Sequence, residues 1–165
     1  MPTVVRSRDL QVDPDRAWKL LSDPHNLPRW WPETVRVESV EGAPGSRRSR
    51  FTQVFETSKG RAVRADFKIV ESTSGERLVW EQQIEGTPFE KFLRSSSLEM
   101  RVASRGTGES EVTIAARRSL RGVSRLGAPM MTGATKRSLD AALDGIERAL
   151  VGDPTEPQQD REDGA

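Results

Sequence analysis

The chain has 165 residues, of which 31% are charged, and its formal net charge is only +1. A domain specialised for nucleic acid usually carries a strong basic excess, so this balance argues against that class of function. The chain has no cysteine and one histidine, which excludes disulfides and leaves no cluster of typical metal ligands. We therefore expect a single domain without a metal or another cofactor.

The two ends of the chain carry no targeting or membrane signal that we recognise. The N-terminal segment MPTVVRSRDLQV lacks the basic start and apolar core of a signal peptide. No apolar run approaches the roughly 20 residues that span a bilayer. We expect a cytoplasmic protein with no stable membrane insertion. Residues 152–165 hold five acids and one arginine, so we expect a folded domain over 1–151 and a disordered acidic tail.

The first elements are a strand and a helix. Alternation and β-favouring residues predict a strand over 3–12. A helix is predicted over 13–23, with Asp13 as the N-cap and Pro14 at the first helical position. The prolines that follow end this pattern, and a second short helix or turn is expected to carry the adjacent pair Trp30 and Trp31.

From Thr34 onward, a period of two replaces the helical period. Successive segments alternate apolar and polar residues and are separated by short turns such as GAPGS and TSGE. This pattern predicts an antiparallel meander with one packed face and one solvated face. The six predicted strands span 34–41, 48–58, 61–72, 77–85, 93–104 and 111–119.

The helical period returns over 125–151, the longest predicted helix. Its apolar stripe comprises Leu139, Leu143, Ile146 and Leu150. Pro129 and Gly133 are expected to make the first third irregular. Only this helix is long enough to cover the apolar face of the sheet. The predicted fold class is therefore α+β, with a seven-stranded curved antiparallel sheet wrapped around a long C-terminal helix and two short helices between strands 1 and 2.

Two blocks of sequence resemble one known family. Residues 12–42, VDPDRAWKLLSDPHNLPRWWPETVRVESVEG, contain the pattern D-P-x-x-L-P-x-W, and residues 77–100 contain LVW followed by EGTPF. Both are similar to the START-like (SRPBCC) superfamily, in its bacterial polyketide cyclase/dehydrase and lipid-transport branch. The resemblance implies a helix-grip fold. The superfamily includes polyketide cyclases, lipid and sterol carriers, hormone receptors and chaperone activators, so it does not fix one function.

The resemblance suggests different roles for Trp30 and Trp31. Adjacent residues on a helix point about 100° apart, so one ring can fill the core while the other faces a cavity mouth or solvent. The family pattern matches Trp30, which we assign to structure. Trp31 is then the candidate for ligand contact.

Polar residues occupy inward positions on three predicted strands. If the alternation holds, Gln53, Gln82 and Ser96 lie on the apolar face. A buried polar group left unpaired costs about 1–3 kcal/mol, so several on one face favour a hydrated or ligand-filled cavity over a dry core. The alternative is that strand ends or bulges turn these side chains outward, and it applies above all to Arg94.

Large apolar residues are the other candidates for ligand contact. They lie on the predicted strands, in the loop 86–93 and at the start of the last helix. For the two methionines at that helix start, ordinary core packing is an equal alternative. The candidates are Phe51, Phe55, Phe67, Trp80, Phe89, Phe92, Met100, Met130 and Met131.

Catalytic residues are less clearly indicated. His25, in the loop SDPHNLP, could act as a general acid or base, and Arg94 could assist proton transfer. For His25 the alternative is an exposed loop residue without a chemical role. The basic segments 116–125 and 47–50 could bind phosphates or an acidic partner, or could simply lie on a solvated surface.

These observations lead to three hypotheses of function. The first is a carrier or sensor that binds a hydrophobic or aromatic small molecule, lipid-like or polyketide-like, between sheet and helix. The second is a polyketide cyclase or aromatase, which would act mainly by holding a reactive chain in a folded geometry. The third is a protein-interaction module of the chaperone-activator type, whose partner the sequence does not identify.

Overall fold

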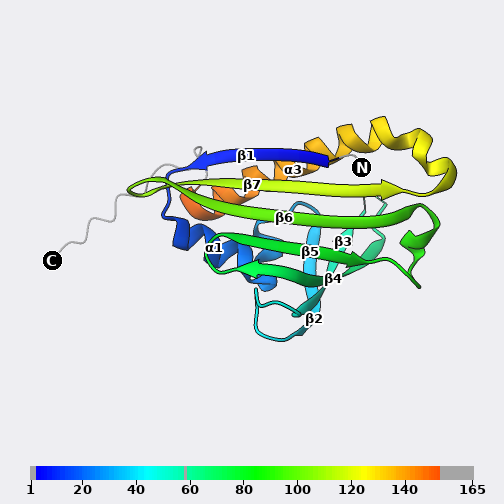
Figure 1. The fold of residues 1–165 in the computed structure, drawn as a ribbon, viewed down its shortest axis with the longest axis horizontal. Coiled ribbons are helices and arrows are strands. Elements are labelled where there is room, and N and C mark those ends of the chain that lie inside the picture. The colour runs from blue at the N-terminus through cyan, green and yellow to red at the C-terminus, as the bar shows by residue number, and fades with distance from the viewer. Residues whose placement is uncertain (1–2, 58, 153–165) are drawn as a thin grey trace.

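Seven antiparallel strands form one continuous sheet in the order β1-β7-β6-β5-β4-β3-β2. The computed structural model describes residues 3–57 and 59–152. In Figure 1, β2 and β3 cross behind the longer strands at a steep angle, so the sheet curves toward the helices. The strands are β1 (Thr3–Leu10), β2 (Thr34–Glu41), β3 (Arg50–Glu56), β4 (Ala62–Thr73), β5 (Arg77–Gln83), β6 (Leu93–Gly106) and β7 (Glu109–Leu120).

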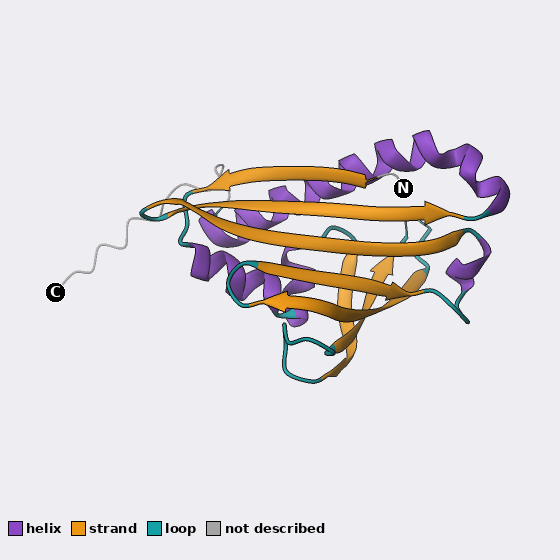
Figure 2. Cartoon of the chain, in the orientation of Figure 1, coloured by secondary structure: helices purple, strands orange, loops and turns teal. Residues whose placement is uncertain are grey.

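The helices gather on one face of this sheet, and the other face is left open (Figure 2). The α-helices are α1 (Pro14–Ser22), α2 (Leu27–Trp30) and α3 (Ala128–Val151). Short 3₁₀ helices are η1 (Pro24–Asn26), η2 (Pro88–Lys91) and η3 (Gly122–Gly127). This arrangement confirms the predicted helix-grip architecture, including the short helices between the first two strands.

One local prediction for the helices is confirmed and another needs correction. Asp13 does occupy the N-cap position of α1, but its side chain makes no capping hydrogen bond. The start of α3 is regular rather than irregular. Pro129 falls within the first two positions of the helix, where no backbone N–H is needed, so the ring is tolerated there. Gly133 continues the helix.

The core lies between the C-terminal half of α3, helix α1 and the inner face of the sheet. Leu139, Leu143 and Ile146 are fully buried against apolar residues of β5, β6 and β7. Trp30 of α2 is 2% exposed and belongs to the same cluster. No helix among the described residues is both long and apolar enough to cross a membrane. The predicted acidic tail lies outside the described residues, apart from Gly152.

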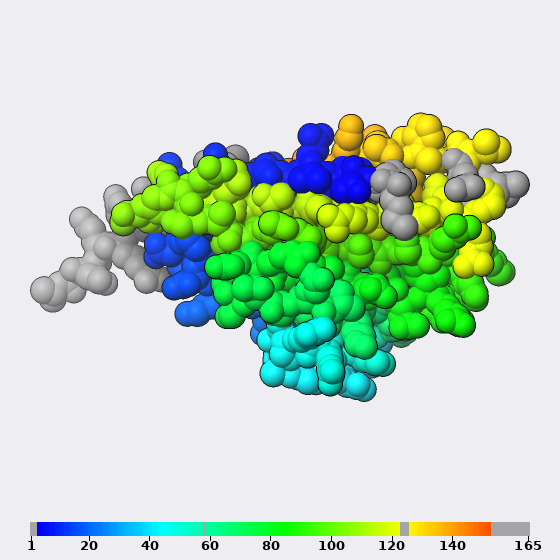
Figure 3. Space-filling view, in the orientation of Figure 1, coloured from blue at the N-terminus to red at the C-terminus, as the bar shows by residue number. Residues whose placement is uncertain are grey.

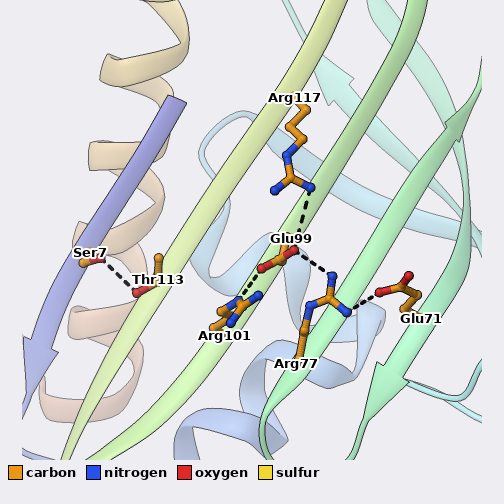
Figure 4. Close-up of polar contacts among 7 residues, drawn as sticks. All are labelled: Ser7, Glu71, Arg77, Glu99, Arg101, Thr113 and Arg117. Atoms are coloured by element: carbon orange, nitrogen blue, oxygen red, sulfur yellow. Dashed lines mark hydrogen bonds and ion pairs between the residues drawn. The ribbon is translucent and has the colours of Figure 1, made fainter. Parts of the chain in front are cut away.

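The outer face of the sheet is polar and carries paired charges. Figure 3 shows this face as a continuous surface of strands β4 to β7. At its centre, Glu99 is buried to 7% side-chain exposure and forms ion pairs with Arg77, Arg101 and Arg117 (Figure 4). Arg77 also pairs with Glu71. Arg77, Arg101 and Arg117 on this face are therefore each matched by a carboxylate.

Candidate functional site

A cavity of about 580 Å³ lies between the sheet and the N-terminal half of α3. We call it the sheet–helix cavity. Its volume falls within the range of small-molecule sites, roughly 300–1,000 Å³. Its lining residues come from the segment after α2, from η2 and the residue after it, from α3 and from five strands: Trp31, Pro32, Glu33, Gln53, Phe55, Ala65, Phe67, Trp80, Gln82, Phe89, Phe92, Leu93, Ser96, Ser97, Leu98, Arg118, Met131, Ala134, Arg137, Ser138 and Ala141.

The helical wall of the cavity consists largely of small side chains. Met131, Ala134, Ser138 and Ala141 recur at intervals of three and four residues and therefore share one stripe of α3. Small residues on this stripe leave space between helix and sheet. The stripe predicted from the sequence was the neighbouring leucine stripe. The stripe of small residues was missed, although its spacing of three and four residues is visible in the sequence.

Aromatic rings form the opposite wall. Trp80 of β5 and Phe67 of β4 lie 5.7 Å apart between ring centroids, and Phe55 of β3 lines the cavity beside them. Phe51 stacks on Phe67 at 5.5 Å and meets Trp80 edge-on at 4.9 Å. The cluster is therefore braced from behind, which gives a flat apolar ligand a preformed surface.

Polar atoms interrupt this apolar wall. Gln53 is buried and donates a hydrogen bond from Nε2 to Thr34 Oγ1 at 2.7 Å. Gln82 Nε2 and Trp80 Nε1 are buried, and neither has a hydrogen-bond partner among the described residues. Buried donors are normally paired, so these two atoms are exceptions in a wall that is otherwise apolar.

The cavity also contains a cation from the basic segment 116–125, for which anion binding and a solvated surface were both open alternatives. Arg118 continues the inward side of β7 from Val112, Ile114 and Ala116 and is partly buried at the cavity wall. Strand parity could have found it, because the residue lies two positions after Ala116. Burial lowers the pKa of its guanidinium. Two other arginines of this basic segment lie outside the cavity: Arg117 points outward to Glu99, and Arg121 is exposed.

The mouth of the cavity is marked by the exposed members of its lining. These are Glu33, Phe92, Ala134 and Arg137. Phe89 lies just inside and its ring centroid is 5.8 Å from that of Phe92. The two phenylalanines of the predicted loop therefore sit beside the opening, on and immediately after η2.

Three predicted ligand contacts do not reach the cavity. Phe51 lies behind the aromatic wall, covered by Phe67 and Trp80. Met100 is fully buried in the core, two residues beyond the last lining residue of β6. Met130 is 81% exposed, because it points about 100° away from Met131 on the same helix. For Phe51 and Met100, strand alternation predicted the correct face of the sheet but not how far along the strand the cavity extends. For Met130, the side chain points away from the cavity.

The two candidate catalytic residues also lie away from the cavity. The pairing of β6 with β7 shifts register between Leu93 and Ser95. This irregularity lets Leu93 and Ser96 both face inward and leaves Arg94 exposed. His25 has a side chain that is 59% exposed, and its Nδ1 lies 2.9 Å from Oδ1 of Asp23 in the same loop. The proton-transfer roles suggested for Arg94 and His25 therefore lack a substrate-facing position.

The tryptophan pair is divided between the core and the cavity. Trp30 is buried, whereas Trp31 is partly exposed and lines the cavity, and the rings meet edge-on at 5.5 Å. Trp30 is held by an unusually close approach of α2 to α3. A Cβ added at Gly145 would lie 2.1 Å from the backbone oxygen of Trp30, so only glycine fits there.

The side chains that line the cavity are suited to binding a small molecule. Within residues 3–57 and 59–152, no group of three or more His, Cys, Asp or Glu side chains is placed to hold a metal ion. The cavity instead combines an aromatic wall, polar side chains such as Gln82 and Ser96, and one partly buried cation, Arg118. These features can hold a largely apolar molecule and orient its polar groups.

Comparison with known families gives one match over nearly the whole described chain. The model of the family described as polyketide cyclase/dehydrase and lipid transport matches residues 1–151. A search of curated proteins found no match.

Solved structures share the fold at low sequence identity. The di-domain aromatase/cyclase BexL from the BE-7585A biosynthetic pathway is 18% identical with a TM-score of 0.74, over 95% of this chain and 48% of that one. This chain thus spans about half of that protein. A START superfamily protein from Mycobacterium smegmatis is 11% identical with a TM-score of 0.74, over 90% and 97% of the two chains. The Zhui aromatase/cyclase from Streptomyces sp. R1128 is 14% identical with a TM-score of 0.73, over 90% and 92%.

Proposed function

This chain belongs to the polyketide cyclase/dehydrase and lipid transport family, and from that premise we propose that it binds a hydrophobic or aromatic small molecule in the sheet–helix cavity, as a carrier or sensor. The observation that carries the proposal is the cavity itself, about 580 Å³ bounded by Trp31, Phe67 and Trp80. Burying apolar surface stabilises a complex by roughly 25 cal/mol per Å² before the costs of association.

The polar atoms on the wall favour one kind of occupant. A purely hydrocarbon ligand would offer no partner to the polar side chains of the lining, Gln82, Ser96 and Arg118. A ligand with an apolar body and a few oxygen acceptors would satisfy them. We therefore expect a molecule with the mixed character of an aromatic polyketide or an oxygenated lipid.

Native mass spectrometry of protein purified from its own host tests this proposal. We expect an adduct of defined mass that leaves on denaturation. The variant Ala141→Phe places a ring in the cavity from α3 and should abolish the adduct. Ala103→Phe makes the same change at an exposed position of β6 outside the cavity lining and should retain it. Retention of the adduct by the folded Ala141→Phe protein would contradict binding in the cavity.

A polyketide cyclase or aromatase is the second candidate. It is favoured by the two aromatase/cyclases among the structural neighbours and by charged groups at the cavity, namely Glu33, Arg118 and Arg137. A cyclase must change the product spectrum of a matching synthase, whereas a carrier leaves it unchanged. Reconstitution with such a synthase separates the two functions, and an unchanged spectrum would remove the cyclase.

A further inference from the structure

Arg118 occupies a polar corner of the sheet–helix cavity where three elements meet. It lies on β7 directly opposite Ser96 of β6, so both side chains emerge on the same face of the sheet. Its Nη1 donates a hydrogen bond of 3.3 Å to Oγ1 of Thr135 on α3. Ser96 and Thr135 are 7% and 4% exposed, so the corner is closed to bulk water on two sides.

Arg118 differs from other inward-facing arginines of the sheet in lacking a carboxylate. Arg6 pairs with Asp140 and Arg8 pairs with Asp144, both across the edge of the sheet to α3. Among the described residues, no Asp or Glu oxygen lies within 4.0 Å of a nitrogen of Arg118. Thr135 can satisfy only one of the five guanidinium N–H donors.

A partly desolvated cation without a counter-ion is unfavourable for the empty protein. Burial lowers the pKa of Arg118, because the charged form loses hydration that no neighbouring anion replaces. An arginine is charged at neutral pH all the same. The arrangement therefore makes sense if the missing anion arrives with the ligand, since an oxyanion would supply charge and accept two N–H bonds at once.

We propose that Arg118 binds an oxyanion group of the ligand, so that the natural occupant is an amphipathic anion with an apolar or aromatic body and one carboxylate-type or phosphate-type end. This inference rests on the proposed function and narrows it to a ligand class. The oxyanion sits at the corner of Arg118, Ser96 and Thr135. The apolar body extends across the sheet toward Phe67 and Trp80.

The sheet sets the length of such a ligand. Arg118 is on β7 and Phe67 is on β4, which lie three strands apart in the sheet order. With about 4.8 Å between neighbouring strands, the two ends of the site are roughly 14 Å apart. A bicyclic or tricyclic aromatic acid, or a fatty acid of medium length, spans this distance. Arg137 at the mouth adds a second positive charge on the entry path.

Two probes with one skeleton test the inference. 1-Anilinonaphthalene-8-sulfonate and N-phenyl-1-naphthylamine differ in the sulfonate, and their own emission reports binding. In Arg118→Met, we expect the dissociation constant of the sulfonate to rise at least about tenfold, the effect of losing a charge-assisted hydrogen bond. The neutral amine should bind the variant as well as the wild type or better. Dodecanoate should displace the sulfonate from the wild type more effectively than dodecanol does.

The control is Arg94→Met, which removes the same charge from an exposed position of β6 outside the cavity lining. It should leave both dissociation constants within about twofold of the wild type. Thermal melting adds a second readout. Loss of an unpaired buried charge should leave the melting temperature of Arg118→Met unchanged or higher, whereas a purely structural arginine would lower it. If Arg118→Met does not fold, Arg118→Lys should show the same loss in smaller measure.

The possible failures are distinguishable. If the wild type binds both probes and Arg118→Met weakens neither, or weakens both equally, the oxyanion site is wrong while the cavity proposal stands. If the wild type binds neither probe and carries no adduct from its host, the proposed function is wrong and this inference falls with it.

Discussion

The inner face of α3 carries small residues at two places, and they have a different effect at each. Toward the start of the helix, Ala134, Ser138 and Ala141 leave space, and the space remains open as the sheet–helix cavity. One turn further on, Gly145 leaves more space still, and the backbone of Trp30 fills it. A small residue on a helix can therefore mark either a cavity or a close contact between two backbones. Which of the two occurs depends on the element that packs against it.

The two parts of α3 are expected to contribute differently, one to the stability of the fold and the other to ligand binding. At the Trp30 end the ring belongs to a core cluster of buried apolar residues that is continuous from α1 to β7. At the cavity end the wall includes polar side chains and a cation without a carboxylate. We expect substitutions at the first end to change the free energy of unfolding and those at the second end to change binding.

The adjacent tryptophans give the largest expected contrast. Trp30→Ala should destabilise the protein by about 3–5 kcal/mol, because it removes a fully buried ring. Trp31→Ala should lower stability by less than about 1 kcal/mol, since its ring is partly solvated, but should weaken ligand binding. Chemical denaturation and probe titration measure the two effects. Equal losses of stability would remove the distinction between the two ends.

Two glycines of α3 provide the next contrast. Gly145→Ala should destabilise by about 2–3 kcal/mol, because the new methyl would collide with the backbone oxygen of Trp30 and push α2 away. In Gly133→Ala the methyl would meet only Arg137 Nη1, at 3.6 Å. That variant should gain up to about 1 kcal/mol from helix propensity. Urea denaturation of both variants checks the pair, and a stable Gly145→Ala would show that α2 is free to move.

The smallest effect is expected on the outer face, where arginines are paired. Burial alone would raise the pKa of Glu99, but hydrogen bonds from Arg77 and Arg101 outweigh it, and the pKa is lowered from 4.5. Ionised Glu99 thus stabilises the fold above pH 4.5, and this contribution is lost as the pH falls through the lower folded-state value. Glu99→Gln should cost about 1–2 kcal/mol near neutral pH.

Denaturation of wild type and Glu99→Gln across the acid range measures this dependence. The difference in stability should be constant near neutrality and should shrink as the pH falls below 4.5. Glu71→Gln, at an exposed partner of Arg77, should have a smaller effect. A difference that does not depend on pH would mean that Glu99 stabilises through its shape and not its charge.

Most of the fold was predictable because the hydrophobic period changes clearly along the chain. Alternation also placed Gln53, Gln82 and Ser96 on the face that now lines the cavity. Parity could not say how far along a strand the cavity begins. Phe51 and Met100 have the right parity but lie where neighbouring rings and helices already fill the space.

Arg118 shows a different limit. Its parity was correct for an inward residue, yet a run of basic residues looks like a solvated surface when read as a group. The structure separates Arg117 from Arg118 by sending them to opposite faces of β7. Arg94 is the reverse case, because a register shift turns it outward, which is the alternative that its place near the strand start suggested. Charged residues in strands have to be interpreted one at a time.

The pairing of β1 with β7 has a consequence for how the protein is made. Within the described residues, the first strand pairs in the sheet with the last strand alone, with Val5 opposite Ala115. Arg6 and Arg8 then tie it to Asp140 and Asp144 of α3, which follows later still. Contacts so distant in sequence form late and slow folding. The sheet edge formed by β7 therefore stays unpaired until β1 docks, and β1 stays unpaired until β7 is present.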